Sequence, residues 1–228
     1  MRPVHQQTPV CFAANQGHEP LHAALGIRLS SHHSEALAEL LPVLICGEES
    51  ASLAFSRLSY APNLSSAHNE LERIEREECV HARLLFRVRL ALPKARTDTA
   101  LSRAAKLFFM RMSEREVGRH FARIAALDSG VCVLLGALRR RRTPTAAEPT
   151  LSPLFARIHR DEARHVLVAR SYARTFSESQ QAHNIAQDTR QQLVELLTHR
   201  AAALEQLLCI DADKLFARLR NPSRGLFA

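Results

Sequence analysis

Charged residues interrupt the apolar stripes of two predicted helices, and this feature restricts the fold of the chain more than any other. In the predicted helix 66–92, apolar residues recur in steps of three and four, and Glu78 and His81 fill the gap in that series. Glu162 and His165 fill the same kind of gap in a later predicted helix. An apolar stripe faces the core, where an uncompensated charge is costly. The chain is therefore expected to form helices that enclose these four side chains.

The Glu-x-x-His spacing alone is a weak signal, because about one such step is expected by chance in a chain of this composition. Glu19 and His22 have the same spacing, but Pro20 lies between them in a segment with no helical period. Helical periodicity therefore separates the two candidate motifs from this third one.

Two further predicted helices carry one carboxylate each on their apolar stripes, Glu48 in 34–59 and Asp128 in 114–141. Four helices thus direct four carboxylates and two imidazoles inward. No Lys or Arg lies on these stripes, and a buried carboxylate without compensating positive charge costs several kcal/mol, so the pattern predicts bound cations. Oxygen-rich ligation with two imidazoles suits iron or manganese, and four negative charges balance two divalent ions.

This constellation is typical of ferritin-like di-iron and di-manganese bundles, in which two helices give one Glu each and two give Glu-x-x-His. The run from Ile158 to His165 resembles the second metal motif of the small subunit of class I ribonucleotide reductase and of bacterial multicomponent monooxygenases. Gly47-Glu-Glu-Ser-Ala is similar to the first-helix motif of those monooxygenases, which favours Glu48 over Glu49 as the ligand. The resemblance covers residues 34–176 and implies a ferritin-like four-helix bundle with a crossover connection.

Three positions depart from the pattern of those families. Their third helix usually carries Glu, and Asp128 is one methylene shorter, so we expect it to bind one ion terminally and not to bridge both. Leu85 stands where the reductase subunit carries its radical Tyr, which argues against a tyrosyl radical of that type. Ile158 stands where N-oxygenases of the superfamily carry an extra His, and His159 is one position off.

The resemblance also implies a layer of supporting residues around the metals. In those families the Asp immediately before the last motif Glu hydrogen-bonds a ligating His, which makes Asp161 the orienter of His81. Glu77 is the matching residue for His165, and Arg164 is assigned to the same layer. The alternative for the two acidic residues is a surface ion pair with a nearby Arg. A substrate pocket is expected one helical turn from the ligands, walled by Phe55, Leu85, Phe121, Ile124 and Ala169.

Few glycines and long segments with a 3.6-residue period predict an all-α fold. Ser113 with Glu116 predicts a capping box, Ser152 before Pro153 predicts an N-cap, and Asp211 is expected to cap the last helix. The connection between the second and third long helices contains a short helix of its own, which predicts a crossover along the bundle. The predicted helices are 34–59, 66–92, 98–111, 114–141, 153–176, 179–208 and 212–220.

One domain is expected, with an irregular arm at 1–33, the metal-binding bundle at 34–176 and extra C-terminal helices at 177–228. The odd number of cysteines, five, without a C-x-x-C step, indicates reduced thiols that act as small apolar fillers. No apolar run reaches the ~20 residues of a membrane span, and no signal-like segment follows Met1. We therefore expect a cytoplasmic protein without membrane contact.

The chain is strongly basic. Its formal net charge is +8 and its pI is about 9.9, which suggests an acidic partner such as a carrier protein, a nucleic acid or an anionic substrate. The run Arg139–Arg142 is interpreted as a solvated helix end, where cations meet the helix macrodipole favourably. With two Tyr and no Trp, stacking on single-stranded nucleic acid has little support.

The favoured function is an O₂-activating dinuclear-iron oxidase or oxygenase that acts on a small or carrier-tethered substrate in an apolar pocket, with manganese as an alternative metal. It would need an electron donor and would work as a monomer or small homo-oligomer. A ferroxidase or iron-storage protein resembling bacterioferritin is the first alternative. The extra C-terminal helices argue against it, because they obstruct the packing of a storage cage. The second alternative is a non-catalytic helical interaction protein with a vestigial site.

Overall fold

The computed structural model describes residues 25–93, 99–221 and 226–227, and within these ranges the chain forms helices and no strand. The predicted all-α class is confirmed. Residues 1–24, and with them Glu19, His22 and Cys11, lie outside the described residues. The helices are α1 (Ser31–Ser59), the short 3-10 helix η1 (Pro62–Ala67), α2 (His68–Ala91), α3 (Thr99–Arg111), α4 (Val117–Leu138), α5 (Pro144–Ala147), α6 (Leu151–Phe176), α7 (Ser179–Thr198), α8 (Ala201–Leu208) and α9 (Ala212–Arg220).

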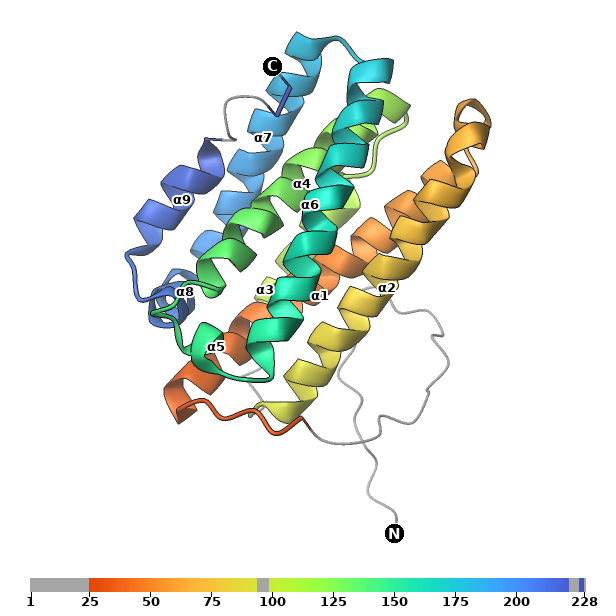
Figure 1. Ribbon diagram of the computed structural model, residues 1–228. Helices are drawn as coiled ribbons and strands as arrows, with labels where there is room; N and C mark the ends of the chain where they lie inside the picture. The colour runs from red at the N-terminus through yellow and green to blue at the C-terminus, as the bar shows by residue number, and fades with distance from the viewer. Residues whose placement is uncertain (1–24, 94–98, 222–225, 228) are drawn as a thin grey trace.

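Two antiparallel helix pairs form the centre of the molecule. α1 packs against α2 and α4 packs against α6, and each pair is joined by a connection at one end (Figure 1). α3 carries the chain back along the bundle, so that α2 and α4 run in the same direction. This is the crossover that the sequence predicts, and the arrangement is compatible with a ferritin-like fold.

The C-terminal helices form an outer layer. α7 packs on α4, α8 packs on α1, and α9 packs against α7 (Figure 1). The sequence predicts one helix at 179–208, but the chain breaks at His199 and Arg200, where the amide of Arg200 donates to the carbonyl of Leu197. The prediction of a single helix is wrong because the two segments bury their apolar faces against different helices.

Two of the three predicted helix caps are wrong. α4 begins at Val117, and Glu116 precedes it without capping it through its side chain, so the Ser113–Glu116 box does not form. α6 begins before Ser152; the Glu148 carboxylate instead accepts from the amides of Thr150 and Leu151 at 2.8 and 2.7 Å. The cap of α9 is confirmed, since Asp211 accepts from the amide of Asp213.

Two apolar clusters build the core, and a layer of carboxylates lies between them along the helices. Leu85 of α2 and Leu135 of α4 belong to the cluster toward one end of the bundle. Phe55 of α1 and Phe121 of α4 belong to the cluster toward the other end. Each long helix therefore passes from one apolar region to the other through a polar level.

Cysteine placement matches the sequence interpretation in part. Cys46 is fully buried as a filler, whereas Cys79 and Cys132 are half-buried. Cys209 is exposed at the end of α8 with a φ of 53°, so the prediction of an apolar filler is wrong there. None of the four cysteines within the described ranges forms a disulfide.

One helix of the described part, α4, is long and apolar enough to cross a membrane, with a mean hydropathy of 1.7. α4 is also a core helix. In its most apolar stretch of 18 residues, 61% is buried inside the fold, and α6 and α7 pack against the helix.

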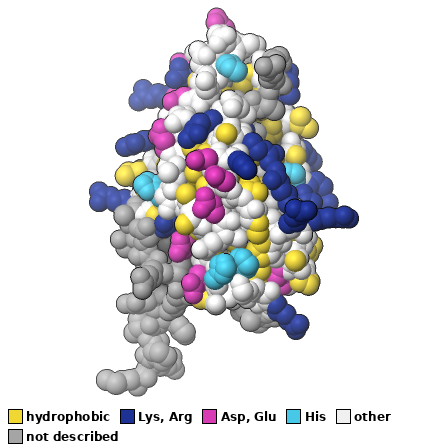
Figure 2. Space-filling view, turned by 90° about the vertical axis from the view of Figure 1, so that its left-hand side faces the viewer, with side chains coloured by type: hydrophobic (Ala, Val, Ile, Leu, Met, Phe, Trp, Pro, Cys, Tyr) yellow, Lys and Arg dark blue, Asp and Glu magenta, His cyan; other side chains and the backbone are white. Residues whose placement is uncertain are grey.

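Basic side chains are prominent on the surface. Figure 2 shows Lys and Arg side chains on both edges of the face that it presents, most densely on the right, with several Asp and Glu side chains nearer the middle. The run Arg139–Arg142 follows the last residue of α4, and all four arginines are exposed, in agreement with a solvated helix end.

Candidate metal centre

Six polar side chains from four helices meet in the layer between the two apolar clusters. None of the six is more than 5% exposed, although each could ionise. They lie there because each replaces an apolar residue on the inward stripe of its helix, so the packing of that stripe carries the polar group into the core. The structure brings together all six residues that the sequence singles out: Glu48, Glu78, His81, Asp128, Glu162 and His165.

The six residues form two overlapping groups of four. Glu78 and Glu162 belong to both groups. Glu48 and His81 complete the first group, and Asp128 and His165 complete the second. Within each group the candidate ligand atoms all lie within 4.8 Å of one another. The two groups could hold a pair of adjacent cations and share two carboxylates, and Asp128 belongs to one group only.

The two imidazoles direct the same nitrogen inward. Nδ1 of His81 lies 3.2 Å from Oε2 of Glu48 and 3.2 Å from Oε1 of Glu162. Nδ1 of His165 lies 2.9 Å from Oε1 of Glu78. Nδ1 is therefore the ring atom of each histidine that could bind a cation.

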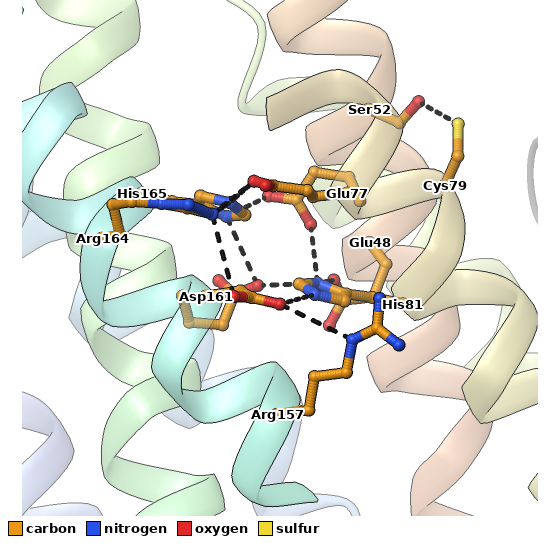
Figure 3. Close-up of polar contacts among 11 residues, drawn as sticks. Glu48, Ser52, Glu77, Cys79, His81, Arg157, Asp161, Arg164 and His165 are labelled. Carbon is orange, nitrogen blue, oxygen red and sulfur yellow. Dashed lines mark hydrogen bonds and ion pairs between the residues drawn. The ribbon is translucent and has the colours of Figure 1, made fainter. Parts of the chain in front are cut away.

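The outward nitrogens contact the supporting acidic residues. Nε2 of His81 lies 3.3 Å from Oδ2 of Asp161, and Nε2 of His165 lies 2.9 Å from Oε2 of Glu77 (Figure 3). These are the pairings that the resemblance implies. An Nε2–H that donates to a carboxylate leaves the Nδ1 lone pair free for a metal and fixes the orientation of the ring.

The same two acidic residues also pair with arginines. The Arg164 guanidinium donates to Glu77 and lies 3.8 Å from Oδ1 of Asp161. Nε of Arg157 lies 3.9 Å from Oδ2 of Asp161. The implied orienting contact and the alternative surface ion pair are thus both present, because each carboxylate lies between an imidazole and a guanidinium.

Several polar atoms of the cluster lack hydrogen-bond partners, and a bound cation would supply the missing contacts. Both carboxylate oxygens of Glu78, Oδ2 of Asp128, Oε1 of Glu162 and Nδ1 of His165 are buried without a partner. The 2.9 Å approach of His165 to Glu78 does not satisfy hydrogen-bond geometry, as expected for two lone pairs that point toward a common centre. Orphaned buried polar atoms are rare in folded proteins. The residues present therefore fit a pair of bound cations.

Burial of the cluster shifts its proton equilibria. Desolvation is the main cause that raises the pKa of Glu48 to about 8, and it also raises the pKa of Asp128, with help from the charges of Glu162 and Glu78. Burial alone would lower the pKa of His165, but contacts with Glu162 and Glu78 outweigh it and raise this pKa to about 11. Without a cation the cluster thus holds protons in place of metal charge.

A cavity of about 450 Å³ reaches the cluster from the seam between α1 and α4, with α3 and α7 closing it. Glu48, Glu78, Asp128 and Glu162 line it, and most of its other lining residues are apolar. The predicted pocket is largely misplaced. Ile124 lines the cavity, whereas Phe55, Leu85, Phe121 and Ala169 are buried, at most 1% exposed, and do not line it. Those four residues fill the two apolar clusters, and the cavity opens on a different side of the ligands.

His120 is a cavity residue that was not among the predicted site residues. It is 6% exposed and lines the cavity two helical turns before Asp128. Its position eight residues before Asp128 on one helix is the signal that could have found it. His159, in contrast, points away from the cluster and lies 3.0 Å from Nη1 of Arg139.

Comparison with known proteins adds no relative. No protein-family model, no curated protein and no solved structure matches the chain.

Proposed function

We propose that the chain is an O₂-activating dinuclear-iron oxidase or oxygenase of the ferritin-like superfamily. One observation carries the proposal: two four-residue groups share Glu78 and Glu162, which line a largely apolar cavity. Four carboxylates and two imidazoles are the ligands that ferritin-like di-iron proteins use. The crossover by α3 is the connection of that fold.

The donor set favours iron, with manganese as the alternative. Carboxylate oxygens suit both ions, and imidazole nitrogen suits iron. Bound iron would supply the electrons that reduce O₂, and an external electron donor would restore them. Glu48 with His81 and Asp128 with His165 would hold one ion each, and Glu78 and Glu162 would bridge the two.

The protein's own residues perform three further tasks in this proposal. Asp161 and Glu77 hold the imidazoles in the orientation that presents Nδ1 to the metals. The apolar cavity walls exclude bulk water from the cluster. Oxidation of a substrate requires that its reacting group lies beside the metals, and the part of the cavity that the four carboxylates line is where the described residues leave space for it.

Iron storage is the alternative that the cavity and the outer helices disfavour. α7 to α9 cover the side of α4 and the end of α1, and a cavity of about 450 Å³ is of the size of a small-molecule site. We therefore propose a monomer or small homo-oligomer. A non-catalytic interaction protein is the third possibility, and it would bind no metal.

Anaerobic loading with Fe²⁺, removal of excess iron and exposure to O₂ test the proposal. We expect close to two irons per chain, O₂ consumption that needs a reductant for each further turnover, and a small assembly by size exclusion. A large hollow assembly that retains hundreds of ferric ions after repeated aerobic loading would establish storage. A chain with no bound metal would overturn both, and the Glu78→Ala/Glu162→Ala double variant is the matched metal-free control.

A further inference from the structure

The cavity has a basic, polar end, and apart from the acidic cluster the rest of its lining is mostly apolar. Arg57 of α1, Ser113 after α3, and His120 and Arg123 of α4 line one end of it. Nη1 of Arg57 lies 3.4 Å from Oγ of Ser113, so the ends of α1 and α3 meet there. Lys106 of α3 also lines the cavity.

The charges at this end do not cancel. Arg123 is paired with Glu114 at 2.8 Å, and Nη2 of Arg119 lies 3.6 Å from the same carboxylate. Among the residues that the structure describes, no carboxylate lies within 4.0 Å of the Arg57 guanidinium, whose hydrogen bond to Ser113 is to a neutral hydroxyl. Arg57 is exposed at the rim and can receive an anion. A guanidinium binds a carboxylate through two parallel hydrogen bonds.

His120 adds a neutral polar group beside Arg57. Burial is the main cause that lowers its pKa to about 4, and the charges of Arg57 and Arg123 act in the same direction against that of Glu114. The imidazole is therefore uncharged near neutral pH. It can exchange a hydrogen bond with a ligand headgroup but adds no positive charge to the site.

The distance from the basic end to the metal ligands sets the length of a ligand. Arg57 follows Glu48 by nine residues on α1, which corresponds to about 13 Å along the helix axis. Apart from Ser50, the α1 side chains that line the cavity between these two levels are apolar, and further apolar residues line it beyond the cluster. The apolar lining includes Leu53, Ile124 and Leu127 on one side of the cluster and Val43, Leu44 and Leu134 on the other.

We propose that the cavity binds an amphiphile with a long, slender apolar chain and a terminal carboxylate, with the carboxylate at Arg57 and Ser113 and the chain running past the acidic cluster. This inference names the substrate class of the proposed oxidase and in that respect rests on the proposed function. Binding itself depends on the cavity and the basic end, and not on iron.

Calorimetric titration of the full chain with decanoate tests the proposal, with decanol, decylamine, decyl phosphate and hexanoate as probes. We expect saturable binding of decanoate, with decanol, decylamine and hexanoate at least about tenfold weaker, because a charge-assisted hydrogen bond and buried methylenes each contribute on this scale. Equal binding of decanol or decylamine, or no binding of decanoate, would overturn the proposal. Tighter binding of decyl phosphate than of decanoate would overturn the carboxylate in favour of a phosphate headgroup.

Two variants localise the headgroup and the chain. Arg57→Gln should weaken decanoate about tenfold and leave decanol unchanged, whereas Arg140→Gln, on an exposed turn away from the cavity, should change neither. Ala54→Phe should obstruct the cavity and weaken both ligands. Unchanged decanoate affinity in Arg57→Gln would overturn the assignment. If decanoate binds but the iron-loaded protein consumes no O₂, the proposed function fails and this inference stands. If the iron-loaded protein consumes O₂ but decanoate does not bind, this inference fails and the proposed function stands.

Discussion

The imidazole rings of His81 and His165 stack across the bundle, with centroids 5.9 Å apart and planes inclined by 30°. His81 belongs to α2 and its supporting Asp161 to α6, while His165 belongs to α6 and its supporting Glu77 to α2. Each supporting residue immediately precedes the motif glutamate of its own helix. The two motifs therefore support each other reciprocally, and the orientation of each imidazole depends on the position of the opposite helix.

The first prediction concerns these supporting contacts. Asp161→Asn and Glu77→Gln keep the side-chain size but remove the negative charge that strengthens each Nε2 hydrogen bond. Loss of such a contact lowers metal affinity by roughly 10- to 100-fold. Competition between the protein and a calibrated chelator for Fe²⁺ or Mn²⁺ measures the effect.

Glu72→Gln is the matched control for these two variants. Glu72 also lies on α2, where it pairs with the surface residues Arg76 and His68. Its loss should leave metal affinity unchanged. If the Asp161 and Glu77 variants bind metal as tightly as this control, the two contacts are ion pairs without influence on the metal centre.

The second prediction separates shared from terminal ligands. Glu78→Ala or Glu162→Ala removes a residue common to both groups and should weaken both ions. Asp128→Ala removes a ligand from one group only, so one ion should remain. Metal analysis after gel filtration gives the number of ions per chain.

Glu49→Gln is the control for that series, because Glu49 is buried beside Glu48 but belongs to neither group. It should retain both ions. Retention of both ions by Asp128→Ala would show that Asp128 is not a ligand, and loss of both would show that it bridges them.

The sequence is sufficient to predict the six residues of the cluster, because an amphipathic period determines which side of a helix faces the core. Asp128 is found in this way although it has no motif of its own, and Glu48 lies on its stripe independently of the short motif around it. The location of the cavity is not predictable by the same reasoning. The apolar periodicity of a helix does not tell which neighbouring helix approaches it most closely. Only the assembled fold shows that α1 and α4 leave space between them, while Phe55 and Phe121 are buried elsewhere.

The helix ends show a second limit of sequence analysis. Ser113 and Glu116 have capping-box spacing, but the structure engages Ser113 with Arg57 and leaves Glu116 without a capping role. Such choices depend on partners that are distant in sequence. The break between α7 and α8 has the same origin, since continuous apolar periodicity cannot reveal that two segments pack on different helices.

The third prediction concerns close packing between α4 and the end of α6. A Cβ added to Gly118 would lie 2.4 Å from the carbonyl oxygen of Phe176 and 2.1 Å from Oγ of Ser177. The backbone carbonyl cannot move aside as a flexible side chain can, so Gly118→Ala should destabilise the fold by roughly 1–3 kcal/mol through overpacking. Urea unfolding of the two proteins measures the difference.

Gly136→Ala on the same helix is the control. A Cβ there meets Nε2 of His159 at 3.6 Å, an ordinary contact. Alanine has the higher helix propensity, so this variant should gain roughly 0.5–1 kcal/mol. Equal effects of the two substitutions would contradict the close approach at Gly118.

The last prediction is that the metal-free protein loses stability as pH rises. In the folded chain the pKa of Glu48 is raised by burial from 4.5 to about 8. The pKa of His165 is raised from 6.5 to about 11 by Glu162 and Glu78, against the opposing effect of burial. The folded state therefore holds more protons than the unfolded state, and stability falls with pH wherever that is so. The contribution of Glu48 is present below pH 4.5 and is lost as the pH approaches about 8.

Metal binding should reverse this dependence. The ligands must be deprotonated to bind a cation, so the stabilisation by metal grows with pH. Thermal unfolding with chelator and with added Fe²⁺ or Mn²⁺, across the window from pH 4.5 to about 8, measures both slopes. In Glu48→Gln, which cannot ionise at this position, the fall in the metal-free melting temperature should be shallower. A metal-free melting temperature that rises through this window would mean that the buried carboxylates are compensated by something other than protons, and the argument for bound cations would lose its electrostatic basis.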